Sequence, residues 1–180
     1  MGNKRASLDY DDVKARVNSA SNDVIGELYG FGQALVSDAV NRLSKADGKA
    51  AGLVAFCGGV ITLTVSTSPS WSSLSSPTFT YSVAIGMLAV FAGALIAASS
   101  VYPQTTEWYA ENDWLRPECL KNPESMMRYR LLTMWRVVSS HHALYRRKTK
   151  RVKEAAFVVG LGFLALFVAF LNVLWRYSAF

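Results

Sequence analysis

The sequence predicts an all-α integral membrane protein with three transmembrane helices and a cytoplasmic helical bundle. Apolar residues make up 51% of the 180 positions, although the chain also carries 19 Lys or Arg and 13 Asp or Glu. These apolar residues gather into three blocks. The last block begins at Ala155, directly after a dense cationic run. Its uncharged stretch of about 21 residues is long enough to cross ~30 Å of hydrocarbon as a helix.

The cysteines and histidines predict neither a disulfide framework nor a metal centre. Cys57 lies in the first apolar block, and Cys119 lies in a segment that we expect in the reducing cytoplasm. His141 and His142 are the only histidines, and no metal-ligand spacing occurs. The sequence also lacks a nucleophile elbow and a glycine-rich phosphate loop. We therefore expect no metal, no cofactor and no enzymatic activity.

Residues 1–49 are polar and charged, and they predict a cytoplasmic N-terminal helix rather than a signal peptide. Apolar side chains recur every three or four residues and form a narrow stripe. Its members are Tyr10, Val13, Val17, Ala20, Val24, Leu28, Phe31 and Leu35. A kink or break is expected near Gly30. The stripe fits either packing against a second cytoplasmic helix or a seam between copies of the chain.

Residues 50–102 predict a transmembrane hairpin. The first span covers about 50–67, close to the lower length limit for a membrane helix, and the second covers about 79–102. The intervening stretch, 66–81, contains no charged residue, two prolines and seven serines, which predicts a loop.

Residues 103–153 predict a cytoplasmic helical segment, and 154–180 the third transmembrane helix with a short outer tail. Asn122-Pro123-Glu124 predicts a helix start, and neither Pro nor Gly follows until Gly160. One continuous helix is therefore expected from Glu124 to Trp175. Its apolar stripe matches that of the N-terminal helix, so the two are expected to pack as an antiparallel or bundled stalk. The members of this second stripe are Met127, Leu131, Met134, Val138, His141 and Tyr145.

The distribution of cations predicts the orientation in the inner membrane of the cell. The loop at 66–81 contains no Lys or Arg, whereas 102–153 contains eleven and the N-terminal segment seven. The positive-inside rule places the cation-rich segments in the cytoplasm. Three spans then place the C-terminus outside.

Small residues in the spans predict where helices approach closely. Ala89, Gly93 and Ala97 follow at a spacing of four in the second span, and Ala55 and Gly59 do so in the first. These contacts form either within one chain or between copies. No ionisable residue lies inside any span, which argues against a pump or a transporter of charged substrates.

A basic cluster precedes the third span and is the strongest candidate site. It consists of Arg146, Arg147, Lys148, Lys150, Arg151 and Lys153. One interpretation is that these cations fix topology and attract anionic lipid, worth ~1 kcal/mol per charge near the surface. The other is that they bind the phosphates of a small anionic ligand. No nucleic-acid recognition module occurs, so we expect no nucleic-acid partner.

The stretch from Arg42 to Phe56 carries the pattern A-D-x-K-A at its centre. Ala46, Asp47, Lys49 and Ala50 supply this pattern. The stretch resembles the helix-to-span turn of the bacterial Pycsar-effector-type membrane domains and the related SLATT domains. The order of elements is also similar: a cytoplasmic helix, a two-span hairpin, a charged helix and a last span. The resemblance covers most of the chain by architecture and is carried by this one short motif.

The resemblance implies an antiphage defence effector that oligomerises in the lipid bilayer after a nucleotide second messenger signals infection, and then breaches the membrane. The chain has no room for a separate cyclic-nucleotide domain, so the cytoplasmic helices or a partner would sense the signal. Asp47 and Lys49 also fit a salt-bridged or snorkelling pair at the membrane entry. An alternative function is a non-conducting scaffold that recruits a cytoplasmic partner through the 104–150 surface.

Overall fold

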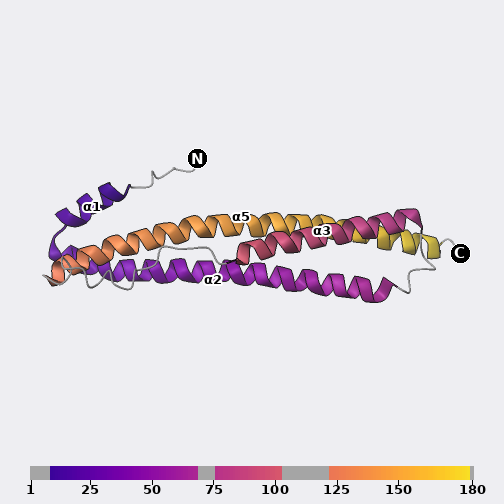
Figure 1. Cartoon of the computed structure of the whole chain (residues 1–180), viewed down its shortest axis with the longest axis horizontal. Coiled ribbons are helices and arrows are strands. Elements are labelled where there is room, and N and C mark those ends of the chain that lie inside the picture. Colours follow the sequence, from indigo (N-terminus) through magenta and orange to yellow (C-terminus); the bar gives the residue numbers. More distant parts are fainter. Residues whose placement is uncertain (1–8, 69–75, 103–121, 179–180) are drawn as a thin grey trace. The chain divides into compact units, whose positions relative to one another are not determined.

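The computed structural model describes residues 9–68, 76–102 and 122–178. Within these ranges the chain forms α1 (Tyr10–Ser19), α2 (Asn22–Thr67), α3 (Pro77–Val101) and α5 (Pro123–Ser178), and no strand (Figure 1). The all-α prediction is confirmed for this part of the chain. Helices α2, α3 and α5 are long and apolar enough to cross a membrane. The predicted loop centre at 69–75, the segment 103–121 with Cys119, and the last two residues lie outside the described residues.

The chain divides into two compact units. The first, which we call the α1 unit, contains the described residues up to Leu43 and those from Asn122 to Leu144. The second, the α3 unit, contains the described residues from Ser44 to Tyr102 and from Tyr145 onwards. Helices α2 and α5 each contribute one half to each unit.

Helix α5 begins as the sequence predicts. The amide of Glu124 donates to the Asn122 side chain at 3.1 Å, and Pro123 is the first helical residue. Proline fits this position because its missing N–H would have no partner in the first turn. Glu124 lies in the first turn. The helix continues without interruption to Ser178, past the predicted end at Trp175. The prediction of one long helix is confirmed.

The predicted N-terminal rod is broken, but not where we expected. Helix α2 runs uninterrupted through Gly30, so the expected break there is wrong. Instead α1 ends at Ser19, the backbone of Ala20 is extended, and the first backbone bond of α2 joins Ile25 N to Ser21 O at 3.0 Å. The short polar side chains around Ala20 favour turns and helix starts over helix interiors, whereas one glycine costs a long helix only up to ~1 kcal/mol.

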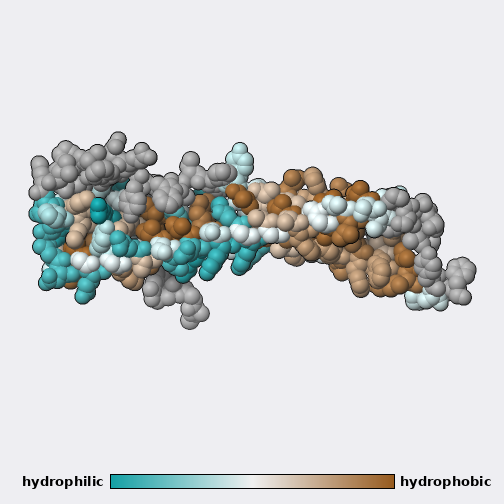
Figure 2. Space-filling model, turned by 90° about the horizontal axis from the view of Figure 1, so that it is seen from below, coloured by the Kyte–Doolittle hydropathy of each residue, from teal (hydrophilic) through white to brown (hydrophobic). Residues whose placement is uncertain are grey.

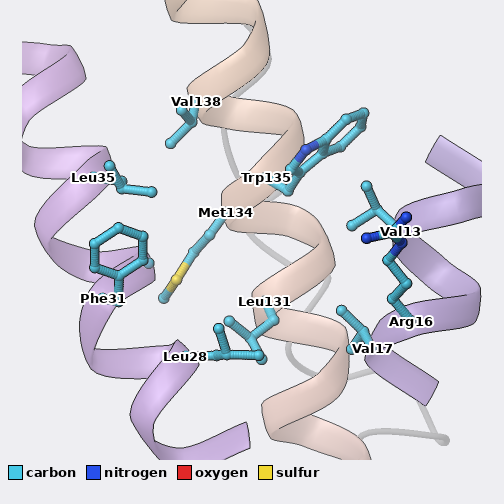
Figure 3. A pocket seen from close by; sticks show the side chains of 11 residues that line it. Val13, Arg16, Val17, Leu28, Phe31, Leu35, Leu131, Met134, Trp135 and Val138 are labelled. Atoms are coloured by element: carbon cyan, nitrogen blue, oxygen red, sulfur yellow. The ribbon is translucent and has the colours of Figure 1, made fainter. Parts of the chain in front are cut away.

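The break lets the two parts of the rod pack on α5 in opposite directions. Helix α1 is antiparallel to α5, because Tyr10 lies beside Trp135 at 6.1 Å between ring centroids while Val17 reaches Arg128. Helix α2 is parallel to α5, as the hydrogen bond from Arg130 to Tyr29 and the contact of Gly32 with Met134 show. The antiparallel prediction therefore holds for α1 only. Figure 3 shows α5 between the other two helices.

A regular seam on α2 faces α5. Its buried or half-buried positions advance by four and three residues in turn, which keeps them on one face of a helix pair. They are Ile25, Tyr29, Gly32, Val36, Ala39, Leu43, Ala46, Ala50, Leu53 and Cys57. The predicted stripe on this helix starts one residue earlier, at Val24, and its largest member, Phe31, is 62% exposed. Small side chains at several seam positions let α5 approach closely, while Ile25 is the largest side chain buried in the seam.

In the α3 unit, α3 packs antiparallel on α5 through small residues. The buried residues of α3 are Phe79, Gly86, Val90, Gly93, Ala97 and Ser100. A Cβ atom at Gly86 would lie 2.7 Å from Leu166 Cγ, and one at Gly93 would collide with Val159. Helix α3 starts at Pro77, two residues before the expected span, because the Ser76 hydroxyl accepts from Phe79 N at 3.2 Å and caps the helix.

Arg128 fastens α1 to α5. Its guanidinium donates to the carbonyls of Val17, Asn18 (2.9 Å) and Ala20 (2.8 Å), and to the side chains of Asn22 and Glu124. The last carbonyls of a helix have no partner within it, and an arginine fork supplies several donors at once. At the other end of α1, Arg136 lies 4.1 Å above the Tyr10 ring.

Replacing Arg128 by methionine should release α1. The change leaves several α1 carbonyls without their charged donor, and hydrogen bonds to charged groups are worth about 2 kcal/mol. Hydrogen exchange of the α1 amides should accelerate roughly 30-fold, while the spans keep their protection. Arg130→Met is the matched control, because Arg130 has a single exposed bond to Tyr29. Equal exchange in the two variants would contradict the role of Arg128.

Candidate functional site

The basic cluster divides into inward and outward side chains. Lys148 is buried, at 5% exposure, and pairs with Asp47, whereas Arg151 donates to the carbonyl of Ser99 at 3.2 Å. Arg151 is nevertheless exposed, as are the other members, Arg146, Arg147, Lys150 and Lys153. Lys150 lies 3.7 Å from Glu154. The structure therefore does not bring all six cations to one phosphate site.

Helix periodicity explains this division. The buried and half-buried positions of α5 also advance by three and four residues. They are Met134, Val137, His141, Leu144, Lys148, Val152, Ala155, Val159, Gly162, Leu166 and Ala169. Lys148 is the one charged side chain in this series, and it takes the place that an apolar residue would fill. That interruption of a regular apolar repeat was the signal in the sequence, and a lysine at such a position is known to fix the register of paired helices.

The ion pair joins α2 to α5 inside the α3 unit. Lys148 Nζ lies 2.6 Å from Asp47 Oδ1, and the side chains are 6% and 35% exposed. The interpretation of Asp47 and Lys49 as an ion pair is corrected, since Lys49 is exposed and Asp47 turns to α5. Residues two apart on a helix do not face each other. Ala46 and Ala50, on either side, are buried and let the two helices approach.

The small residues of α3 make the contact with α5. Gly93 and Ala97 are buried, and Ala89 is half-buried. Sequence reasoning missed Gly86 and Gly162, which face each other so closely that a Cβ on either would lie 2.9 Å from a carbonyl oxygen of the other helix. The spacing of seven between Gly86, Gly93 and Ser100 was the available signal, because a repeat of 3.5 stays on the seam and a strict repeat of four rotates away from it.

Ala55 and Gly59 lie elsewhere, on a surface without neighbours in the described chain. Both are exposed, and no atom lies within 4 Å of a Cβ built at Gly59. Gly48 and Gly52 extend them at spacings of four, three and four, and are equally open. This surface, which we call the α2 small-residue face, is displaced from the seam by two residues. At about 100° per residue, the face lies about 200° around the helix, opposite to α5.

The other side chains that could react or bind a metal do not form a cluster in the described chain. Cys57 is a buried free thiol in the seam, and His141 is buried with its Nδ1 atom 2.8 Å from the Val137 carbonyl. Across residues 9–68, 76–102 and 122–178, no three His, Cys, Asp or Glu side chains come together. The candidate site therefore consists of the basic cluster, the Asp47–Lys148 ion pair and the contacts between helices.

Removing either partner of the Asp47–Lys148 pair should have unequal effects. Asp47→Asn leaves a buried ammonium without its anion. We expect it to lower the free energy of unfolding by about 2 kcal/mol, less than for a fully buried pair because Asp47 is partly exposed. Lys148→Met should cost less than ~1 kcal/mol, since the remaining carboxylate reaches water. The double variant should resemble Lys148→Met. Denaturation of the reconstituted protein by dodecyl sulfate measures these values, with the exposed Lys49→Met as control. An Asp47→Asn cost no larger than that of the control would refute the ion pair's contribution.

Comparison of the chain with protein-family models, with curated proteins and with solved structures finds no match. The resemblance carried by Ala46, Asp47, Lys49 and Ala50 stays a prediction. The function of this chain is therefore inferred from its own residues.

Proposed function

We propose that this protein is an oligomeric effector of the inner membrane that forms a pore or disrupts the bilayer. Helices α2, α3 and α5 cross the membrane, with the N-terminus in the cytoplasm and the C-terminus outside. The α1 unit is the cytoplasmic bundle. A nucleotide second messenger or a partner protein acts on that bundle during phage infection and triggers the effector.

The observation that carries this proposal is the amount of apolar surface that one chain leaves uncovered. In the most apolar window of α2, α3 and α5, only 11%, 22% and 17% of the residues are buried. On the face drawn in Figure 2, apolar side chains dominate the α3 unit, and polar side chains are frequent over the α1 unit. Uncovered apolar area of this extent is stable in lipid or against other copies of the chain.

The directions of the helices also favour three crossings. In the α3 unit, α2 and α5 run parallel to each other and antiparallel to α3 (Figure 1). Three successive spans in one membrane must alternate in this way. Four exposed cations precede the uncharged stretch of α5 that begins at Ala155, where cations meet the anionic cytoplasmic leaflet. They are Arg146, Arg147, Lys150 and Lys153.

The α2 small-residue face supports an oligomer. Three glycines of α3 and α5, namely Gly86, Gly93 and Gly162, make tight contacts within the chain. The α2 small-residue face, by contrast, has no partner among the described residues; it consists of Gly48, Gly52, Ala55 and Gly59, spaced by four, three and four. Small residues in membrane helices let backbones approach, and contacts of this kind drive association in lipid. We propose that this face meets a neighbouring copy.

Expression of the full-length chain tests the proposal. In bacterial cells challenged with phage, a potential-sensitive dye should report depolarisation that begins only after infection and needs the intact chain. An intact membrane potential at high expression during infection would count against a pore. A stoichiometric cytoplasmic partner recovered from detergent would, in that case, favour the scaffold alternative.

The oligomer should depend on the α2 small-residue face. Leucine at both Gly52 and Gly59 has room in the single chain, so the fold should persist, but the bulk should separate neighbouring copies. Overpacking of about 1–3 kcal/mol predicts an association roughly five- to 140-fold weaker in nanodiscs or mild detergent, measured by mass photometry. Gly160→Leu is the control, because Gly160 is equally open but lies on α5. If both proteins assemble alike, a different surface forms the oligomer.

A further inference from the structure

An apolar groove in the α1 unit has the size of a ligand site. Its cavity measures about 440 Å³, within the ~300–1,000 Å³ typical of small-molecule pockets. Helix α5 forms the floor with Leu131, Met134 and Val138, and α2 forms one wall with Leu28 and Phe31 (Figure 3). Helix α1 forms the other wall. Phe31 is 62% exposed although its side chain is large and apolar.

Among the residues that the structure describes, Arg16 is the single charged one that lines this groove. The other described arginines of the α1 unit have partners: Arg42 pairs with Asp38, Arg128 holds α1, Arg130 donates to Tyr29, and Arg136 covers Tyr10. The Arg16 guanidinium has no hydrogen bond, ion pair or ring contact within residues 9–68, 76–102 and 122–178. Figure 3 shows its side chain extending along α1 to the level of Val13.

We propose that this groove binds an amphiphile with one hydrocarbon chain and one carboxylate head, such as a long-chain fatty acid. The apolar walls cover the chain, and Arg16 pairs with the head in a fork-shaped, charge-assisted contact. Because the walls come from α1 and α2 and the floor from α5, a bound amphiphile holds the three helix segments together. This inference does not rest on pore formation, since the site lies wholly in the α1 unit.

Photolabelling of the full-length protein tests the site. The protein is reconstituted in phosphatidylcholine nanodiscs and exposed to a palmitate analogue with a diazirine in its chain. Peptides with Leu28–Leu35 and Leu131–Val138 should be labelled in a saturable manner, and unlabelled palmitate should compete. Labelling of the apolar half of α5 by probe dissolved in the bilayer is the internal reference.

Two substitutions separate the apolar and the charged contacts. Gly32→Leu places a side chain, or the Met134 thioether that it displaces, in the groove, and should reduce groove labelling about tenfold relative to the reference. Gly30→Leu is its control, because Gly30 is open and does not line the groove. Arg16→Gln should weaken palmitate competition about tenfold, Arg16→Lys should restore part of it, and Lys14→Gln should leave it unchanged.

The outcomes decide the proposal. Hexadecanol should compete poorly with the wild type and as well as palmitate with Arg16→Gln. Equal competition by the two compounds in the wild type would overturn the contact with the carboxylate. Absent groove labelling, or labelling that Gly32→Leu leaves unchanged, would overturn the site and would favour a protein helix as its occupant. Depolarisation of cells is a separate readout, so its presence or absence does not affect this result.

Discussion

Everything in this chain depends on a seam between α2 and α5 that repeats every 3.5 residues. On α2 it runs from Ile25 to Cys57, and on α5 the series of buried positions that begins at Met134 passes into the contact with α3 at Gly162 and Leu166. The repeat keeps each pair of facing positions in contact over many turns, which a strict 3.6 periodicity would not. Alanine and glycine at many of these positions bring the backbones close, so that dispersion between many atom pairs replaces the burial of large side chains. Large apolar side chains are left for lipid, for other copies and for ligands.

The seam, the proposed contact between copies and the proposed ligand site lie on three different surfaces. The seam consumes one face of α2, the small-residue face lies opposite to it, and the groove in the α1 unit lies beside the seam at Leu28 and Phe31. Each surface has its own chemistry. The seam is closely packed around an ion pair, the small-residue face is open, and the groove has apolar walls with Arg16 at its edge. The small-residue face can be changed without touching the seam, whereas Gly32 and Met134 belong to both the seam and the groove.

The sequence determines much of this fold, and the limits of prediction have a physical cause. Local signals predicted α5 almost to the residue, because Asn122 and Pro123 start it and no glycine or proline interrupts its first half. The seam was predicted less well. A search for apolar stripes favours large side chains such as Phe31, whereas close helix packing selects Gly32, Ala39 and Ala46 one position away. The role of Lys148 in the seam was also not predicted, because the sequence analysis grouped this residue with the neighbouring cations and not with the apolar repeat that it interrupts.

The buried ion pair constrains how the α3 unit can move. If α5 slid along α2 by one turn, Lys148 would leave Asp47 and enter a stretch lined by alanine and leucine, where an unpaired ammonium is strongly disfavoured. Rotation of the two helices about their common seam, or separation of α3 from α5, keeps the pair intact. The Asp47–Lys148 ion pair therefore opposes sliding of α5 along α2. Any opening of these helices has to proceed by rotation about the seam or by separation of α3 from α5.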